Sequence, residues 1–301
     1  RKEKDEYRIL SGYKDGHTTG APLCVIFENT NTQSKDYENL KVLLRPNHSD
    51  YPAGVKYKGF NDIRGGGHFS GRITLALTFA GAVAMDILEE KGIKIFSHIK
   101  KILDIKDKSF LDFKEVDIDK FKNLKESSLA FIESDLETKT KELLEKIKLS
   151  GNSVGGEIEC ACYNLPVGLG SPFFDSLESK ISHLAFSVPA VKGIQFGIGF
   201  DFSNILGSEA NDLYYLDNNQ IKTGSNNNGG ILGGLSTGMP LVFSVVIKPT
   251  PSISIEQETV NVKEMKNDIL KINGRHDACI VPRVMPVIEA ITALAILDEI
   301  I

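Results

Sequence analysis

Two segments within the first hundred residues have distinct hydrophobic patterns, one typical of a strand and one of a helix. Residues 20–30, GAPLCVIFENT, place a run of apolar positions after a glycine and predict a strand. Residues 73–88 are apolar on nearly every side of a helical wheel, and Gly92 ends the run. Since a helix that is hydrophobic all round is normally buried all round, we expect a strand followed by a fully buried helix.

Two more helices are predicted further along the chain. Between residues 129 and 147 large apolar side chains recur at helical spacing, and Gly151 follows the last of them. This pattern indicates an amphipathic helix that packs along one stripe. Residues 287–297 form a last apolar run, and Pro286 directly before it suits the first turn of a helix.

Short apolar runs in the second half of the chain predict strands at residues 157–165, 194–202, 241–248 and 253–255. In the first of these, Cys160 and Cys162 should point to the same side, with Ala161 opposite. The strands cluster instead of alternating strictly with helices. We therefore predict an α+β fold with antiparallel sheets, and the length of the chain suggests one or two domains.

Two stretches have no clear period. Residues 45–67 are rich in proline and glycine and predict a long loop, a feature that is often functional inside a compact domain. Residues 100–125 carry charges of both signs and predict a solvated segment. Together with the helix that follows, this segment makes residues 95–149 the variable, helical part of the domain.

Composition and charge exclude several classes of protein. The chain has 301 residues, 41% hydrophobic and 25% charged, and can bury a sizeable core. Its net charge of −5 argues against a general nucleic-acid binder. We find no uninterrupted run of about 18 apolar residues and expect no membrane span. No signal peptide is visible, but the chain starts with Arg1, so we expect a further N-terminal segment before it.

The chain contains four cysteines, Cys24, Cys160, Cys162 and Cys279. The C-x-C pair lacks the second pair that a zinc site would need. We interpret all four as reduced thiols, mostly in the core, and this fits a cytoplasmic protein.

The first candidate for chemistry is RPNHSDY, residues 45–51. His48 stands in a polar, proline-containing loop, and histidine can both give and take a proton near neutral pH. Arg45 could hold an anion beside it. An ordinary surface histidine is the alternative interpretation.

The second candidate is RGGGHFSGR, residues 64–72, which leads directly into the predicted buried helix. Glycines at a helix N-terminus expose backbone N–H groups that suit a phosphate, and Arg64, Ser70 and Arg72 add donors. The sequence is neither a P-loop nor a dinucleotide fingerprint. A structural tight turn remains the alternative.

Two further motifs lie in the second half of the chain. Residues 226–238, NNNGGILGGLSTG, could let a flat ligand approach the backbone, although an irregular turn would have the same composition. Residues 248–252, KPTPS, supply a cation and two hydroxyls. In GRHD, residues 274–277, Arg275 could keep Asp277 ionised, unless the two form only a surface ion pair.

The joint order of these motifs closely resembles chorismate synthase, over nearly all of residues 7–298. The resemblance implies that family's α+β sandwich, in which helices pack between antiparallel sheets, as a single domain over residues 1–301. It also implies its reaction, the anti-1,4-elimination of phosphate from 5-enolpyruvylshikimate 3-phosphate to give chorismate. The family needs reduced FMN and usually forms a homotetramer, and some members, mostly fungal, reduce their flavin with NADPH.

The resemblance implies roles for individual residues. His48 matches the histidine that protonates reduced flavin, and Asp277 matches the aspartate that helps flavin N5 to act as a base. Arg72 matches an arginine near the substrate phosphate, and we assign Arg45 to the substrate as well. The positions that match cofactor contacts are His68, Phe69, Ser70, Pro189, Ala190, Gly233, Lys248, Pro249, Thr250, Pro251, Ser252 and Arg275.

The chain departs from the family pattern at two points. Many members carry arginine where His68 stands. The family also has a second catalytic histidine in a Ser-His-Gly sequence near the N-terminus, and none of the six histidines here has that context. We expect it in the segment before Arg1.

Two other functions remain open at this point. His48, Asp50, His276 and Asp277 are residue types that could hold zinc or manganese in a hydrolase, although they lack the spacing of ligands on one helix face. A non-catalytic phosphate-binding or assembly protein on the same fold is the third possibility, supported only by the absent Ser-His-Gly sequence.

Overall fold

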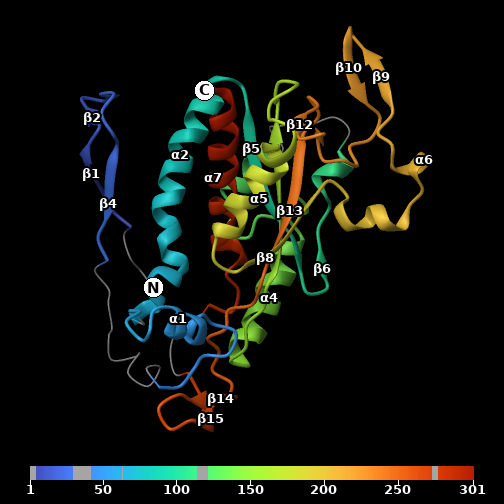
Figure 1. Cartoon of the computed structure of the whole chain (residues 1–301). Helices are drawn as coiled ribbons and strands as arrows, with labels where there is room; N and C mark the ends of the chain where they lie inside the picture. Colours follow the sequence, from blue (N-terminus) through green and yellow to red (C-terminus); the bar gives the residue numbers. More distant parts are fainter. Residues whose placement is uncertain (1–4, 30–41, 63, 114–120, 273–276) are drawn as a thin grey trace.

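A five-stranded antiparallel sheet forms the centre of the molecule (Figure 1). The computed structural model describes residues 5–29, 42–62, 64–113, 121–272 and 277–301. Every neighbouring pair of strands in the sheet is antiparallel, as predicted. The strand order is β6 (Ile105–Lys106), β5 (Lys94–Ile102), β7 (Gly156–Tyr163), β13 (Leu241–Ile247) and β8 (Val191–Phe196).

Both faces of the sheet are covered at β7. The Cys160 side chain faces the C-terminal helix, where its Sγ lies 3.6 Å from Thr292 Oγ1. Cys162 follows on the same face by strand alternation, as predicted. On the other face the ring of Tyr163 stacks on Phe121, with centroids 6.1 Å apart. Burial on both sides explains why this strand is nearly continuous in apolar residues.

Helices cover the face of the sheet that carries Cys160. α7 (Val281–Ile300) packs on β5 and β7, α5 (Leu177–Ser187) packs on α7 and β8, and α2 (Thr74–Glu90) packs along α7. A Cβ atom at Gly81 of α2 would lie 2.2 Å from the Cβ of Ala290, so only glycine allows the two helices to approach this closely. Figure 1 shows α2 and α7 side by side.

The remaining elements are ribbons and short helices. The ribbons are β1 (Tyr7–Ser11) with β4 (Cys24–Phe27), β2 (Tyr13–Lys14) with β3 (His17–Thr18), β9 (Tyr214–Asp217) with β10 (Gln220–Thr223), β11 (Ile231–Leu232) with β12 (Leu235–Ser236), and β14 (Gln257–Asn261) with β15 (Lys266–Leu270). The helices are α1 (Asp50–Lys56), α4 (Leu136–Leu149), α6 (Gly207–Ala210), η3 (Arg64–Phe69), η4 (Gly71–Ile73), η5 (Phe110–Asp112), η6 (Asn123–Lys125), η7 (Phe173–Asp175) and η8 (Gly199–Asn204). In Figure 1, α1 and the β14–β15 ribbon lie together at the lower end.

The expectation that residues 73–88 form a helix buried all round is wrong. α2 forms there, but only Gly81, Ala84 and Leu88 are buried. Its outer side is partly covered by the β1–β4 ribbon, where the rings of Tyr7 and Phe79 lie 5.0 Å apart. Within the described residues, 71–90 is also the one stretch apolar and long enough to cross a membrane, with a mean hydropathy of 1.5. Because core helices of other proteins pass the same test, the expectation of no membrane span stays a prediction.

Residues 100–125 are not a solvated segment. The described part forms the end of β5, β6 and two short helices, and Ile102, Phe110, Phe121 and Leu124 in it are buried. The predicted helix at 129–147 begins only at Leu136, because residues before it bond to the sheet region: Ile99 N–H donates to Ala130 O over 2.8 Å. The end of this helix next to Gly151 is as predicted.

Four other boundaries differ from the sequence prediction. Residues 45–67 contain α1 and the start of η3 instead of one continuous loop. The strand predicted at 194–202 ends at Phe196 and continues as η8, and residues 253–255 form no strand. The last helix begins at Val281, with Pro282 in its first turn, so that Pro286 lies inside it. Burial of α7 along most of its length outweighs the helix-breaking tendency of this proline.

Candidate active site

Several of the predicted motifs meet at the C-terminal end of β13, where Lys248 follows the strand. The backbone N–H of Lys248 donates to Ala190 O over 2.9 Å, and Ala190 has a positive φ of 77° that turns the chain into β8. The Lys248 ammonium donates to the backbone carbonyl of Asn47 over 2.6 Å and lies 3.3 Å from Asn47 Oδ1. Three predicted regions, at residues 45–51, 189–190 and 248–252, are therefore in contact.

Thr250 connects this cluster to the segment before α7. Its Oγ1 donates to Asp277 O over 3.4 Å, and its own carbonyl accepts from Ser153 Oγ over 2.7 Å. The Asp277 carboxylate lies 3.0 Å from the guanidinium of Arg283 in α7. The sequence predicted Arg275 as the partner of Asp277, but Arg275 lies outside the described residues.

His48 is held by a buried ion pair. Its Nδ1 lies 2.7 Å from Asp50 Oδ1, and the same carboxylate accepts two hydrogen bonds from the Arg45 guanidinium. The side chains of Arg45 and Asp50 are only 7% and 8% exposed, whereas that of His48 is 17% exposed. His48 is therefore a half-buried side chain in an ordered turn, which does not fit the alternative of an ordinary surface histidine.

The local backbone explains why this turn forms. Asn47 has a positive φ of 58°, a conformation that asparagine tolerates better than most residues. Asp50 then begins α1, and an acidic side chain there is favoured by the helix dipole. On the other side, Leu43 pairs with Asn261 of β14, and Thr259 Oγ1 donates to Leu44 O. The β14–β15 ribbon thus supports the loop that carries His48.

Charges at the site shift two pKa values. Burial alone would raise the pKa of Asp50, but hydrogen bonds from Arg45 and His48 and the charges of these side chains lower it well below its usual range. Burial, and next to it the positive charge of Lys192, lower the pKa of Lys248. The positive charge of Lys192 thus disfavours the charged form of Lys248, and an anion beside Lys248 would offset this effect.

The glycine-rich motif lies at the other end of α1. Tyr57, which caps α1, contacts the His68 ring edge-on with centroids 5.4 Å apart and the Phe69 ring at 6.4 Å. α1 has seven residues, so its length of about 10 Å separates Asp50 at its start from Tyr57 at its end. Ser70 caps η4 by accepting from the Arg72 backbone N–H over 3.2 Å. The Arg72 guanidinium lies 3.1 Å from Asp5.

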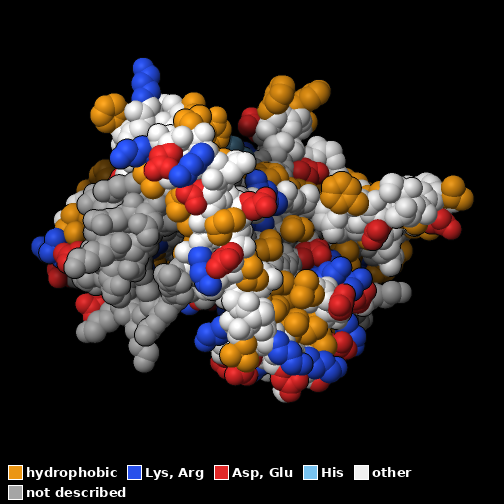
Figure 2. Space-filling model, turned by 90° about the horizontal axis from the view of Figure 1, so that it is seen from below, with side chains coloured by type: hydrophobic (Ala, Val, Ile, Leu, Met, Phe, Trp, Pro, Cys, Tyr) orange, Lys and Arg blue, Asp and Glu red, His pale blue; other side chains and the backbone are white. Residues whose placement is uncertain are grey.

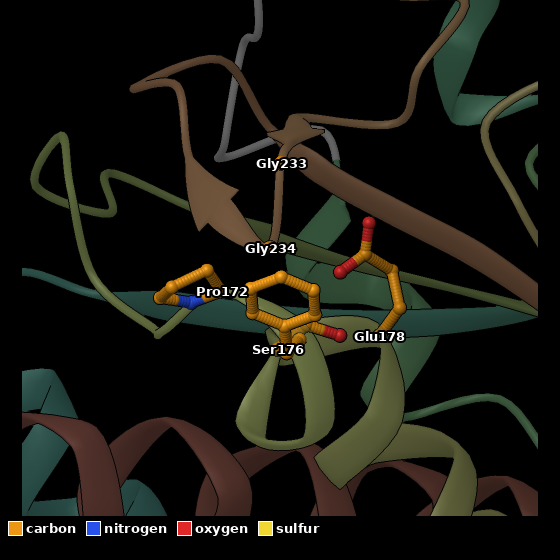
Figure 3. A pocket seen from close by; sticks show the side chains of 6 residues that line it. Pro172, Ser176, Glu178, Gly233 and Gly234 are labelled. Carbon is orange, nitrogen blue, oxygen red and sulfur yellow. The ribbon is translucent and has the colours of Figure 1, made fainter.

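Gly233 lies apart from this cluster. It turns the chain between β11 and β12, before the start of β13, whereas Lys248 follows the end of β13. The seven residues of β13 separate the two ends by about 23 Å. Gly233 and Gly234 line an open depression of about 520 Å³ together with Pro172, Phe173, Ser176 and Glu178 (Figure 3).

The asparagine stretch before Gly233 has a structural explanation. Asp212 accepts from the backbone N–H groups of Asn227 and Asn228 over 2.8 and 3.0 Å. A Cβ atom at Gly197 would lie 1.9 Å from Asn227 O, so this loop packs tightly against the end of β8. For residues 226–230, the irregular-turn interpretation is the better one.

Sequence reasoning missed the residues that organise the cluster. Asp50 was considered only as a metal ligand, and Arg283, Asn47 and Tyr57 were not considered. The signal for Asp50 was present, since it stands two residues after His48 in the same motif. Within the described residues, no group of three His, Cys, Asp or Glu side chains is placed to hold a metal ion.

A histidine held by a carboxylate, a lysine at a strand end and a second carboxylate in the segment before α7 are a combination typical of enzymes that move protons beside an anionic small molecule. The chain belongs to the chorismate synthase family, whose model matches residues 1–301. As a member of this family it is a lyase.

The most similar relatives support this assignment over the whole chain. The chain is 43% identical to the chorismate synthase of Thermococcus kodakarensis, covering 100% of this chain and 82% of that protein. It is 44% identical to a chorismate synthase of Dehalococcoides mccartyi, over 99% of this chain and 80% of that protein. A crystal structure of chorismate synthase superimposes with a TM-score of 0.75 at 27% identity, covering 97% and 77% of the two chains, and confirms the α+β fold.

Proposed function

We propose that this chain converts 5-enolpyruvylshikimate 3-phosphate to chorismate and phosphate by anti-1,4-elimination, with reduced FMN as its cofactor. The observation that carries the proposal is the contact of Lys248 with the His48 loop, within a chain of this family. It brings a proton donor and a cation together from positions 200 residues apart in sequence.

The residues around Lys248 fit a flavin phosphate and ring. Burial and the positive charge of Lys192 disfavour the charged form of Lys248, and an anion would offset this effect. Next to α1, Tyr57, His68 and Phe69 offer a group of aromatic rings, and Phe69 is 37% exposed. Aromatic side chains of this kind stack on flat ring systems. Reduced FMN, when bound, supplies electron density that helps phosphate to leave and takes it back as the ring C–H bond breaks.

The remaining roles follow the same arrangement. His48 gives its proton from Nε2, since Nδ1 is engaged by Asp50. Asp277 holds the reacting end of the cofactor, Arg275 is assigned to it by the resemblance alone, and Arg72 holds the anionic substrate. Arg45 was predicted for the same substrate role, but its guanidinium is engaged by Asp50. Ser70, Pro189, Ala190, Gly233 and the segment 249–252 line the cofactor; for Gly233 this assignment rests on the resemblance alone.

We further propose that the protein is a cytoplasmic homotetramer. The β9–β10 ribbon projects from the body and exposes Leu213, Leu216 and Ile221 by 70% or more (Figure 1). Apolar side chains gathered on one projecting element are typical of contact surfaces between subunits. All four cysteines are free thiols, which fits a reducing compartment.

The direct test is an anaerobic assay of phosphate release from 5-enolpyruvylshikimate 3-phosphate by the full-length protein. We expect release with dithionite-reduced FMN and none with oxidised FMN. A second arm replaces dithionite with NADPH and tests whether the protein reduces its own flavin. No release with reduced FMN, from protein that binds the flavin, would instead favour a non-catalytic role.

A further inference from the structure

Both oxygens of the Asp50 carboxylate are held by neighbouring groups of the candidate site. Its Oδ2 accepts from the Arg45 backbone N–H over 3.0 Å and from Arg45 Nε over 2.7 Å. Its Oδ1 accepts from the Arg45 guanidinium over 2.6 Å and faces His48 Nδ1 at 2.7 Å. Both oxygens are therefore engaged, and the carboxylate cannot turn away from His48 without breaking contacts with Arg45.

We propose that Asp50 is the positioning residue of His48: it fixes the imidazole ring and its tautomer, so that Nε2 is presented to the ligand. This inference rests on the proposed function, because it assigns His48 a proton to deliver. Asp50 itself touches neither cofactor nor substrate in this assignment and acts only through His48.

The chemistry of the contact determines the tautomer. An ionised carboxylate is an acceptor only, so the ring nitrogen that faces it must carry a hydrogen. The two hydrogen bonds from Arg45 keep the Asp50 carboxylate ionised, since they favour its charged form. Neutral His48 therefore carries its hydrogen on Nδ1, which leaves Nε2 to receive and deliver the exchangeable proton.

The positive charge of Arg45 reduces the electrostatic effect of the Asp50 carboxylate on His48. The guanidinium forms two short contacts with the carboxylate and neutralises much of its charge. The net field at His48 is therefore smaller than that of a lone carboxylate. We infer that orientation, more than charge, is the contribution of Asp50, and that Arg45 is what holds the carboxylate in place.

The first measurement needs no substrate. Nitrogen-15 labelling of the histidines, with His48 assigned from the His48→Gln variant, reports which ring nitrogen carries the hydrogen. We expect the Nδ1–H tautomer of neutral His48 in the unaltered protein and a mixture richer in Nε2–H in Asp50→Asn. A predominant Nε2–H form in the unaltered protein would overturn the proposal, whether or not any variant folds and whether or not phosphate is released.

The second measurement is a double-mutant cycle on phosphate release. For Asp50→Asn we expect kcat to fall about 10- to 100-fold with KM within about twofold, a smaller loss than for His48→Ala. Asp50→Asn should add nothing further in the His48→Ala background, because it acts through that side chain. Asp112→Asn, which alters a carboxylate that caps η5 at a distance from the site, should leave kcat unchanged.

Two results would contradict the assignment. If the losses of Asp50→Asn and His48→Ala multiply in the double variant, Asp50 acts independently of His48. Asp50→Glu keeps the negative charge but moves the carboxylate. If this variant has the full activity of the unaltered protein while its His48 lacks the Nδ1–H tautomer, positioning is not the role of Asp50. A protein with the expected tautomer but no phosphate release would contradict the proposed function alone.

Discussion

Two side chains, Asp50 and Lys248, make the central polar contacts of the candidate site. Asp50 bonds within its own motif, whereas Lys248 bonds to Asn47 across 201 positions of sequence. Lys248 also sits beside the positive charge of Lys192. At the scale of single residues, the affinity for an anionic cofactor should therefore depend on Lys248 more than on any distant lysine.

Replacing Lys248 with glutamine tests this directly. We expect the dissociation constant for FMN, measured by quenching of flavin fluorescence, to rise about 10-fold or more, because a hydrogen bond to a charged group contributes about 1.5 to 3 kcal/mol. Lys139→Gln on exposed helix α4 is the matched control and should change nothing. Equal affinities of the Lys248 variant and this control would remove Lys248 from the cofactor site.

Part of this residue-level picture could be predicted from the sequence. His48, Lys248, Thr250 and Ala190 were identified, and the structure brings them together. Their contacts could not be predicted, because each depends on the end of β13 meeting a loop from another part of the chain. The Arg283–Asp277 contact is local, but the sequence offered Arg275 as the nearer candidate partner of Asp277.

At the scale of elements, a buried ionic cluster fixes the segment after β5 to the sheet. His98 of β5 lies 3.0 Å from both Asp107 and Glu159, and all three side chains are 0% exposed. Asp107 also accepts from the backbone of Ile132 and Glu133. The sequence could not indicate this, because the charged pattern of residues 100–125 reads as solvated unless the pairing partners are known.

The cluster predicts how stability depends on pH. Burial alone would lower the pKa of His98, but its hydrogen bonds to Asp107 and Glu159 raise it. The contribution of His98 to the unfolding free energy is therefore complete below its pKa in the unfolded chain, and it is lost as pH rises through its pKa in the fold. For Glu159, His98 and Lys100 outweigh burial and lower the pKa to about 2, so its contribution is lost as pH falls below about 4.5. We expect a plateau between about pH 4.5 and 6.5.

Urea unfolding from pH 4 to 8 measures this dependence. Between pH 6.5 and 8 the unaltered protein should lose up to about 1.4 kcal/mol of unfolding free energy per pH unit more than His98→Gln, which has no proton to lose. His183→Gln, on the exposed side of α5, should keep the slope of the unaltered protein. Parallel curves for the unaltered protein and His98→Gln would show that His98 is not protonated in the fold.

At the scale of the whole molecule, the antiparallel sheet and its helical layer follow from the sequence, as does the order of the motifs. The lower end of the molecule, seen from below in Figure 2, mixes side chains of both charges with apolar ones and shows no field of a single sign. The site cluster and Gly233 lie at opposite ends of β13, a separation that no linear motif could reveal. Only the path of the chain decides which motifs meet.

The exposed β9–β10 ribbon carries the prediction about assembly. Light scattering after gel filtration should give a mass of about four chains for the unaltered protein, and Leu216→Lys, with Leu216 now 70% exposed, should lower it. Lys266→Gln, which changes an exposed charge on the β14–β15 ribbon, is the control and should leave the mass unchanged. A mass of one chain for the unaltered protein would contradict the proposed tetramer.

The location of the flavin tests the proposed site most directly. A crystal structure of the protein with FMN and 5-enolpyruvylshikimate 3-phosphate would show which side chains surround the ring. We predict that His48, Lys248 and Asp277 of one chain all contact the same bound flavin or its substrate. A flavin that lies in the depression beside Ser176 and Glu178, with His48 and Lys248 out of reach, would contradict the proposed site.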